Sequence, residues 1–401
     1  MTGIVIIGAG HAAGQAAASL RQAKFEGPVT IIGDETHIPY QRPPLSKQYL
    51  AGTQPADKVY LRAEKFYADK DIQLMLDTRA TQIDPSTKTI NLDNGETIAY
   101  EKLLISTGSR PRRLSIVGSD LNGIHYLRTM DDVAGIRADV KPDANLVIVG
   151  GGYIGLEVAA VGIELGMNVH VLEMEERILQ RVTTPEMSAY YHKLHSDRGV
   201  HIHTQTGVTG FAGNGSVEKV LCGDRSFDAD IVIVGIGIIP NIEIAEEAGI
   251  HCDNGIVVDD HCRTSDPDIY AAGDCTNHPN PLMNKRLRLE SVPNAMDQAR
   301  VSTANMLGDD KVYAAIPWFW SDQYELKLQM VGFSADGDSQ VLRGDMDSHQ
   351  FAIFYLKDGK VVAADAVNSP KEFMLCKQLI GKPADPAQLA DPETDLKSLL
   401  S

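Results

Sequence analysis

The chain has 401 residues, 43% of them hydrophobic and 23% charged, which is typical of a globular protein with two or three domains. Its formal net charge of −17 argues against nucleic acid and anionic membranes as partners. The sequence contains no run of about 18 apolar residues, so it predicts no membrane span. The first apolar segment is not preceded by the basic start of a signal peptide, and no cleavage site of small residues is found, so we expect a cytoplasmic protein.

The first elements predict a dinucleotide-binding βαβ unit. They are strand 4–7, glycine turn 8–14, an Ala-rich helix through residue 20 and strand 29–32. Gly8 permits a tight turn, Gly10 lets a pyrophosphate approach the backbone, and Ala13 is small enough for helix and strand to pack closely. The acidic residues Asp34 and Glu35 follow the second strand, where such units bind a ribose.

Short strands broken by turns follow from residue 72 to residue 104. The last of them runs into Thr107-Gly108. An apolar strand that ends in Thr-Gly indicates a backbone turn placed against a ligand. Segments 231–237 and 269–274 have the same form, so we expect two further turns of this kind.

A second βαβ unit begins at residue 146. Its elements are strand 146–149, glycine turn 150–155, a helix through residue 165 and strand 169–172. Glu173 ends the second strand, where a carboxylate binds both ribose hydroxyls and repels a 2′-phosphate, so NADH is favoured over NADPH. Two complete units in one chain indicate a flavin and a nicotinamide, between which orientation makes hydride transfer fast.

The end of the chain predicts a small third domain. Alternating and aromatic runs at 318–320, 351–356 and 360–364 indicate an antiparallel sheet, with a short helix near 371–379 packed on it. The predicted fold is therefore α/β, with two Rossmann-like dinucleotide-binding domains and a small α+β C-terminal domain. The expected boundaries are 1–109 and 238–312 for a discontinuous FAD domain, 110–237 for the NAD domain and 313–401 for the C-terminal reductase domain.

Five motifs resemble those of the FAD-dependent ferredoxin reductases of bacterial oxygenase systems, which belong to the flavoprotein superfamily of glutathione reductase. They are Arg42-Pro43-Pro44-Leu45-Ser46-Lys47, Gly150 to Glu157, Gly273-Asp274-Cys275, Ser291 to Ala295 and Pro317 to Gln323. The resemblance covers essentially the whole chain and implies the same fold and the same cofactors, FAD and NADH.

The resemblance also implies a set of ligand contacts. The residues implied for FAD are Gly8, Gly10, Ala12, Asp34, Arg42, Lys47, Ala80, Thr107, Gly108, Arg128, Asp274, Val292 and Trp320. The βαβ pattern itself adds Ala13 and Glu35 to the FAD site. The residues implied for NADH are Gly150, Gly152, Ile154, Gly155, Glu157, Glu173, Arg181 and Gly237. Glu290, just beyond the basic run 285–288, is a further candidate that can approach the nicotinamide.

Lys47 and Glu157 are the predicted catalytic residues. An ammonium near the flavin stabilises the electron-rich reduced ring, and related flavoproteins pair this lysine with the glutamate at the position of Glu157. Asp274 can accept a hydrogen bond from a ribityl hydroxyl. Plainer interpretations stay open: Lys47 on the surface, Glu157 as an ordinary helix residue, and Asp274 as a helix cap.

The cysteines exclude an internal electron acceptor. The five of them, at positions 222, 252, 262, 275 and 376, form neither CxxC nor CxxxxC. Disulfide reductases of the superfamily carry CxxxxC where this chain has the cysteine-free segment 38–47. Reduced flavin must therefore pass its electrons outward, and the expected acceptor is a [2Fe–2S] ferredoxin that supplies a cytochrome P450 or a Rieske-type oxygenase.

Two features of the sequence are candidates for receiving the ferredoxin. Trp320 can anchor the partner or mediate electron transfer, or it can pack in a domain core with Trp318. The basic cluster Lys285, Arg286 and Arg288 can steer an acidic partner, or it can be a solvated loop.

Other acceptors and other roles stay open on the same fold. A rubredoxin reductase or a monodehydroascorbate reductase differs only in the acceptor, and an NADH-sensing flavoprotein like the apoptosis-inducing factor differs in role. No metal site is predicted, because the paired histidines 192 and 195, and 201 and 203, have no cysteine or carboxylate beside them in a ligand pattern. We expect all four to be surface histidines.

Overall fold

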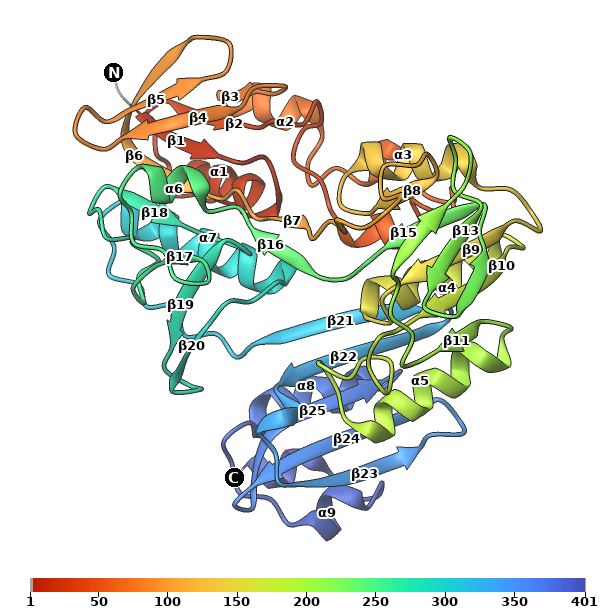
Figure 1. Cartoon of the computed structure of the whole chain (residues 1–401). Helices are drawn as coiled ribbons and strands as arrows, with labels where there is room; N and C mark the ends of the chain where they lie inside the picture. Colours follow the sequence, from red (N-terminus) through yellow and green to blue (C-terminus); the bar gives the residue numbers. More distant parts are fainter. Residues whose placement is uncertain (1–2, 401) are drawn as a thin grey trace. The chain divides into compact units, whose positions relative to one another are not determined.

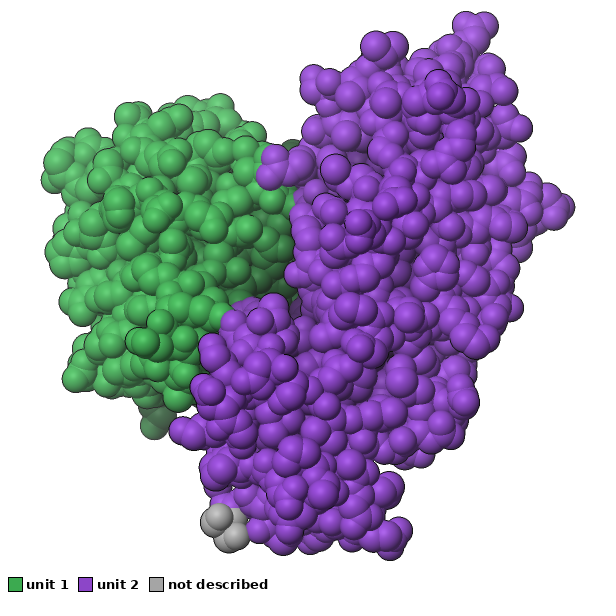
Figure 2. Space-filling model, turned by 60° about the horizontal axis from the view of Figure 1, so that its bottom comes forward, with its two compact units in different colours: residues 1–42, 55–110, 238–317 green, residues 43–54, 111–237, 318–401 purple. Residues whose placement is uncertain are grey.

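The computed structural model describes residues 3–400 and forms two compact units, coloured separately in Figure 2. Unit 1 comprises Met1–Arg42, Pro55–Arg110 and Ile238–Pro317. Unit 2 comprises Pro43–Gln54, Pro111–Gly237 and Trp318–Ser401. Segment 43–54 and the C-terminal segment thus group with residues 111–237, whereas the three-domain division stays a prediction.

Unit 1 is built on a mostly parallel sheet with the strand order β3-β2-β1-β6-β5-β4, in which β18 also pairs with β6 (Figure 1). The strands are β1 (Gly3–Ile7), β2 (Val29–Ile32), β3 (Ile72–Met75), β4 (Ala80–Asp84), β5 (Thr89–Leu92), β6 (Thr97–Ile105) and β18 (Ile269–Ala271). All residues of β1, β2 and β18 are buried, as expected for parallel strands covered on both faces.

Helices α1 (His11–Gln22) and α7 (Val292–Met306) pack against one core of this sheet, together with Ile4, Leu104 and Tyr270. The remaining elements of unit 1 are short. They are η2 (Ala56–Lys58), α2 (Glu64–Asp69), β7 (Ser109–Pro111, whose last residue belongs to unit 2), β16 (Ile238–Pro240), α6 (Glu243–Glu247), β17 (Ile256–Val257), β19 (Thr276–Asn280) and β20 (Lys285–Leu287). The predicted first βαβ unit is confirmed as β1–α1–β2.

Unit 2 contains a parallel five-stranded sheet with the order β11-β10-β9-β15-β8. Its strands are β8 (Ile124–Tyr126), β9 (Asn145–Val149), β10 (Asn168–Leu172), β11 (His201–His203) and β15 (Ile231–Val234). The predicted second βαβ unit is confirmed as β9–α4–β10, with α4 at Tyr153–Glu164. Further elements are η1 (Pro43–Ser46), α3 (Met130–Asp139), α5 (Pro185–Asp197) and the antiparallel sheet of β12 (Gly210–Ala212), β13 (Lys219–Cys222) and β14 (Arg225–Asp228).

The C-terminal segment forms the predicted antiparallel sheet, with the order β21-β22-β25-β24-β23. Its elements are β21 (Trp318–Gln323), β22 (Leu326–Gly332), η3 (Ser334–Asp336), β23 (Ser339–Asp345), β24 (Gln350–Lys357), β25 (Lys360–Val367), α8 (Pro370–Leu379), α9 (Pro386–Ala390) and η4 (Leu396–Leu400). Side chains of α4, α5 and this sheet, including Leu156, Tyr191 and Phe351, share one hydrophobic core, which explains why the segment belongs to unit 2.

None of the helices between residues 3 and 400 is long and apolar enough to cross a membrane.

Candidate functional site

The first glycine of each βαβ turn is required by the fold itself. Gly8 has φ +103° and Gly150 has φ +110°. A Cβ on Gly8 would lie 2.3 Å from the carbonyl oxygen of Ser106, and one on Gly150 would lie 2.4 Å from that of Gly235. No side chain fits at either position, and only glycine adopts this backbone without strain.

The second glycine of each turn is not required by any contact within the protein. A Cβ on Gly10 or Gly152 would meet no protein atom within 4 Å, although these residues precede the first turns of α1 and α4. Neither helix has an acidic residue in its first turn to balance the partial positive charge of its N-terminus. Open space beside N–H donors fits the pyrophosphate of a dinucleotide, so both turns suit FAD or NADH.

The acidic residues that follow the two units make different contacts. The carboxylate of Glu173 accepts hydrogen bonds from the backbone N–H groups of Gly151, at 2.7 Å, and Glu175, at 2.9 Å. It is thereby held at its own glycine turn. The carboxylate of Glu35 instead accepts from Arg42 at 2.7 Å and from the Tyr40 hydroxyl at 2.5 Å.

The turn at Asp274 is held from two sides within unit 1. The backbone N–H of Gly273, which has φ +92°, donates to Oε1 of Gln298 at 2.8 Å. The hydroxyl of Ser109 donates to Oδ2 of Asp274 at 2.8 Å. Ser109 and Gln298 were not predicted from the sequence, although Ser109 directly follows the Thr107-Gly108 turn.

Lys47 and Glu157 form a buried ion pair in unit 2. Nζ of Lys47 lies 2.6 Å from Oε2 of Glu157, and the two residues are 9% and 1% exposed. Ser46 donates to the same oxygen at 2.5 Å, and Ser321 donates to Oε1 at 2.7 Å. Burial raises the pKa of Glu157, and the lysine and the two hydroxyls oppose that rise.

The other residues implied for ligands are spread over both units. In unit 1, Thr107 donates to the carbonyl oxygen of Asn241 at 2.6 Å, and Gly108 has φ +63°. The remaining positions in unit 1 are the buried residues Ala12, Ala13 and Ala80, exposed Asp34, and Val292 at the first position of α7. The remaining positions in unit 2 are half-buried Arg128 before α3, Gly155, the exposed residues Ile154 and Arg181, and Gly237 with φ +104°.

Trp320 lies in an aromatic cluster on unit 2. Its ring centroid is 5.6 Å from that of Trp318, and the ring of Trp318 lies 5.6 Å from that of Phe373. Nζ of Lys377 lies 4.8 Å from the centroid of Trp318. Both tryptophans keep part of their surface exposed, so neither is a fully buried core residue.

The basic cluster is more constrained than the sequence indicates. Residues 285–287 form strand β20 and not a loop, although Lys285 and Arg286 are exposed to solvent as that alternative expected. Arg286 donates to the backbone carbonyl oxygens of Val258, at 2.8 Å, and Asn277, at 2.5 Å. Arg288 forms an ion pair with Glu290 at 2.6 Å. The ion pair partly offsets the charge of Arg288, whereas the bonds of Arg286 to neutral carbonyl groups leave its charge in place.

The prediction that His195 is a surface histidine is also wrong. Its side chain is fully buried, because its face of α5 packs on the C-terminal sheet. Nε2 of His195 lies 2.8 Å from Oε1 of Gln323. Burial lowers the pKa of His195 to about 4, so the ring is neutral at physiological pH.

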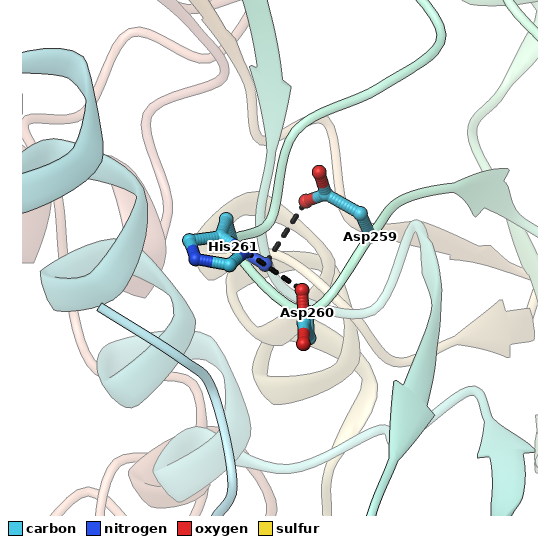
Figure 3. Close-up of side chains that lie close together, drawn as sticks. All are labelled: Asp259, Asp260 and His261. Carbon is cyan, nitrogen blue, oxygen red and sulfur yellow. Dashed lines mark hydrogen bonds and ion pairs between the residues drawn. The ribbon is translucent and has the colours of Figure 1, made fainter. Parts of the chain in front are cut away.

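Figure 3 shows a separate polar cluster at Asp259, Asp260 and His261, whose potential metal-ligand atoms lie within 4.8 Å of one another. Asp259 accepts from the backbone N–H of His261 at 2.9 Å. The ring nitrogens of His261 lie 2.7 Å from Asp260 and 2.8 Å from Asp310. Both nitrogens are thus bonded to carboxylates, so hydrogen bonds and ion pairs account for the cluster.

Comparisons with known proteins cover both ends of the chain. Residues 2–299 match the family of pyridine nucleotide-disulphide oxidoreductases, and residues 318–400 match the reductase C-terminal family. Putidaredoxin reductase from Pseudomonas putida is 44% identical in an alignment that covers 99% of this chain and 96% of that protein. The ferredoxin–NAD(+) reductase component of the anthranilate 1,2-dioxygenase system of Burkholderia cepacia is 42% identical in an alignment that covers 99% of this chain and 98% of that protein.

The fold agrees with a solved structure of the same kind. The reductase in the crystal structure of the covalent putidaredoxin reductase–putidaredoxin complex matches with a TM-score of 0.96 and 43% identity, over 100% of this chain and 98% of that one. The cysteine-free segment 38–47 shows that the chain lacks a disulfide at that position despite the family's description. The chain therefore belongs to the pyridine nucleotide-disulphide oxidoreductase family, as a ferredoxin reductase of the putidaredoxin reductase type.

Proposed function

We propose that the chain oxidises NADH with bound FAD and delivers the electrons singly to a [2Fe–2S] ferredoxin, which supplies a cytochrome P450 or a Rieske-type oxygenase. One observation carries the proposal. Two glycine turns each leave open space at the second glycine, beside a helix N-terminus without a balancing acid. Two pyrophosphate sites in a chain without a CxxxxC motif fit a flavoprotein whose acceptor is another molecule.

We assign FAD to the turn of unit 1 and NADH to that of unit 2. The proposed FAD residues of unit 1 are Gly8, Gly10, Ala12, Ala13, Asp34, Glu35, Arg42, Ala80, Thr107, Gly108, Asp274 and Val292. The proposed NADH residues of unit 2 are Gly150, Gly152, Ile154, Gly155, Glu173 and Arg181, with Gly237. Lys47, Glu157, Arg128 and Trp320 in unit 2, and Glu290 in unit 1, are proposed from the sequence alone.

The protein's own groups have distinct tasks in this proposal. When bound, FAD accepts two electrons as hydride from NADH and releases them one at a time. The N-termini of α1 and α4 hold the two pyrophosphates. Asp274, oriented by Ser109, accepts from a hydroxyl of the cofactor chain. Glu157 pairs with Lys47 and holds its side chain in place, so that the ammonium can stabilise negative charge on the flavin ring.

The nucleotide preference follows from Glu173. Its carboxylate is fixed at the glycine turn by the N–H groups of Gly151 and Glu175. At that position it can accept from both ribose hydroxyls of NADH, and its charge repels the 2′-phosphate of NADPH. A cytoplasmic location is part of the proposal, because the reaction needs a compartment that supplies NADH.

The test is stopped-flow absorbance of the flavin. The purified protein is mixed with NADH or NADPH, and then with an oxidised [2Fe–2S] ferredoxin. We expect fast bleaching with NADH only, followed by reoxidation matched by reduction of the ferredoxin. Fast bleaching without electron transfer to any ferredoxin tried would contradict the proposed acceptor. Transfer to rubredoxin or monodehydroascorbate would identify a different reductase, and slow reoxidation by every acceptor would identify an NADH sensor.

A further inference from the structure

We propose that Ser321 is a positioning residue for the Lys47–Glu157 pair, and that a chain of hydrogen bonds from α5 holds its hydroxyl in place. The inference rests on the proposed function, in which this ion pair acts on the flavin. It assigns a task to the C-terminal segment 318–400, which supplies both Ser321 and the next hydrogen-bonding residue, Gln323.

The inner part of the hydrogen-bond chain lies on β21. Ser321 and Gln323 are two residues apart on this strand, so their side chains point to the same face. They are 0% and 1% exposed. The hydroxyl of Ser321 donates to Oε1 of Glu157 at 2.7 Å, and Nε2 of Gln323 donates to the Ser321 oxygen at 3.1 Å.

The outer part lies between α5 and the residue after β21. Nε2 of His195 is 2.8 Å from Oε1 of Gln323, and Nδ1 of His195 is 3.1 Å from the hydroxyl of Tyr324. Oε1 of an amide can only accept, so Nε2 of His195 carries the ring proton. Nδ1 of the neutral ring must then accept, and the tyrosine hydroxyl donates to it.

All four hydrogen bonds therefore point the same way, toward the carboxylate. The sequence of donors is Tyr324, His195, Gln323 and Ser321, and Glu157 accepts the last bond. Aligned hydrogen bonds polarise one another, and donors to a carboxylate favour its charged form. The amide of Gln323 does not titrate. The hydrogen-bond chain therefore orients Ser321 and does not carry a proton between His195 and Glu157.

The ion pair depends on this orientation because Glu157 is buried. Lys47 and Ser46 donate to Oε2, and Ser321 satisfies the other oxygen, Oε1. Two titratable groups interact electrostatically with Glu157, namely Lys47 next to η1 and Tyr191 on α5. Of these, Lys47 is the cation in direct contact with the carboxylate.

The central variant is Ser321→Ala, measured in the FAD-loaded protein. The readout is an infrared pH titration of the protonated carboxyl band of Glu157, which is assigned by its loss in Glu157→Gln. Removing one donor to a charged group weakens the charged form, so we expect the carboxyl to protonate about tenfold more readily, a rise of about one pKa unit. The acid limb of the pH profile for flavin reduction by NADH should rise equally.

Three further variants sharpen the test. Ser188→Ala is the matched control, because Ser188 is 2% exposed and donates to the backbone oxygen of Ile178 at 2.5 Å, away from Glu157. Ser321→Thr keeps the hydroxyl and should restore the original titration. Gln323→Met keeps Ser321 but removes its donor, so it should shift the titration the same way by less. If Ser321→Ala fails to fold, Gln323→Met still tests the hydrogen-bond chain.

Two outcomes would overturn the inference. The first is a Ser321→Ala protein, or in its place a Gln323→Met protein, that titrates like the unmodified protein. The second is a Ser188→Ala protein whose titration shifts as far as that of Ser321→Ala. Failure of the proposed function gives a different result, because the carboxyl band would still shift in a protein that NADH does not reduce or that passes no electrons to a ferredoxin.

Discussion

The two βαβ units, β1–α1–β2 and β9–α4–β10, share their turn geometry but differ in the contacts that one helix position makes. When the glycine turns are aligned, Gln15 of α1 corresponds to Glu157 of α4. Gln15 is half-buried and donates to Ser19 of its own helix at 2.9 Å. Glu157 is 1% exposed and pairs with Lys47, which lies outside the βαβ unit. The turn thus sets the class of ligand, and a partner from elsewhere in the chain completes the buried ion pair of Glu157.

The largest expected contrast between the units is in the free energy of unfolding, when the polar contact at Glu157 or at Gln15 is removed. Lys47→Met leaves the carboxylate of Glu157 buried without its cation, and we expect it to lower the free energy of unfolding by about 3 kcal/mol at neutral pH. Gln15→Met removes one half-buried contact and should change this free energy by less than about 0.5 kcal/mol. Urea unfolding of both variants, followed by circular dichroism, measures the difference.

The effect of Lys47→Met should depend on pH in a defined direction. Burial already raises the pKa of Glu157 in the folded state, and losing Lys47 removes a contact that opposes this rise. When the pKa of a carboxyl group is higher in the folded than in the unfolded state, the group destabilises the fold increasingly as the pH rises from the unfolded pKa to the folded pKa. The loss of unfolding free energy caused by Lys47→Met should therefore become smaller toward acid pH. A loss of the same size at every pH would mean that packing, and not charge, is responsible.

The next contrast separates the two glycines within one turn. Gly150→Ala places a Cβ 2.4 Å from the carbonyl oxygen of Gly235 at φ +110°, so we expect it to destabilise the fold by about 2 kcal/mol. Gly152→Ala places its Cβ in open space. It should leave unfolding unchanged but raise the KM for NADH about tenfold, because the added methyl group occupies the space assigned to the pyrophosphate.

The corresponding pair in unit 1 provides the comparison. Gly8→Ala should destabilise the fold, and Gly10→Ala should weaken FAD binding without affecting NADH binding by unit 2. Thermal melts and flavin content measure both effects. Equal loss of stability from Gly10→Ala and Gly8→Ala would show that the second glycine serves the fold after all.

The acids that follow the two units should also behave differently. Glu173→Gln keeps the shape of the side chain but weakens its bonds to the ribose and removes its repulsion of a phosphate, so the preference for NADH over NADPH should fall about tenfold. Glu35→Gln should leave that preference unchanged, because Glu35 contacts Arg42 and Tyr40 in unit 1. Steady-state kinetics with each nucleotide decides between these results.

The smallest expected effect concerns the turn at Asp274. Ser109→Ala removes the hydrogen bond to Oδ2 of Asp274, and we expect FAD to bind about threefold to tenfold more weakly. Ser106→Ala is the control, because Ser106 is also 6% exposed at the end of β6 and donates to the backbone oxygen of Ile7. Fluorescence of released FAD measures the affinity, and equal weakening in both variants would remove the assigned role of Ser109.

The fold could be predicted in large part because its signals are local. Strand, glycine turn and helix follow one another along the chain, and each of Gly8 and Gly150 is needed by the turn it forms. Alternation of side chains likewise predicted the C-terminal sheet. The surface assignment of His195 failed for the opposite reason, since its burial depends on a sheet that begins more than a hundred residues later.

What the sequence determined by itself is the class of ligand and the absence of an internal dithiol, since both depend on residues that are neighbours in the chain. The tertiary structure decided which side chains contact the predicted site residues. Glu157 is 110 residues from Lys47 and 164 from Ser321, and Asp274 is 165 from Ser109. A charged group can be buried only where partners satisfy it, and folding alone brings such distant partners within hydrogen-bond distance.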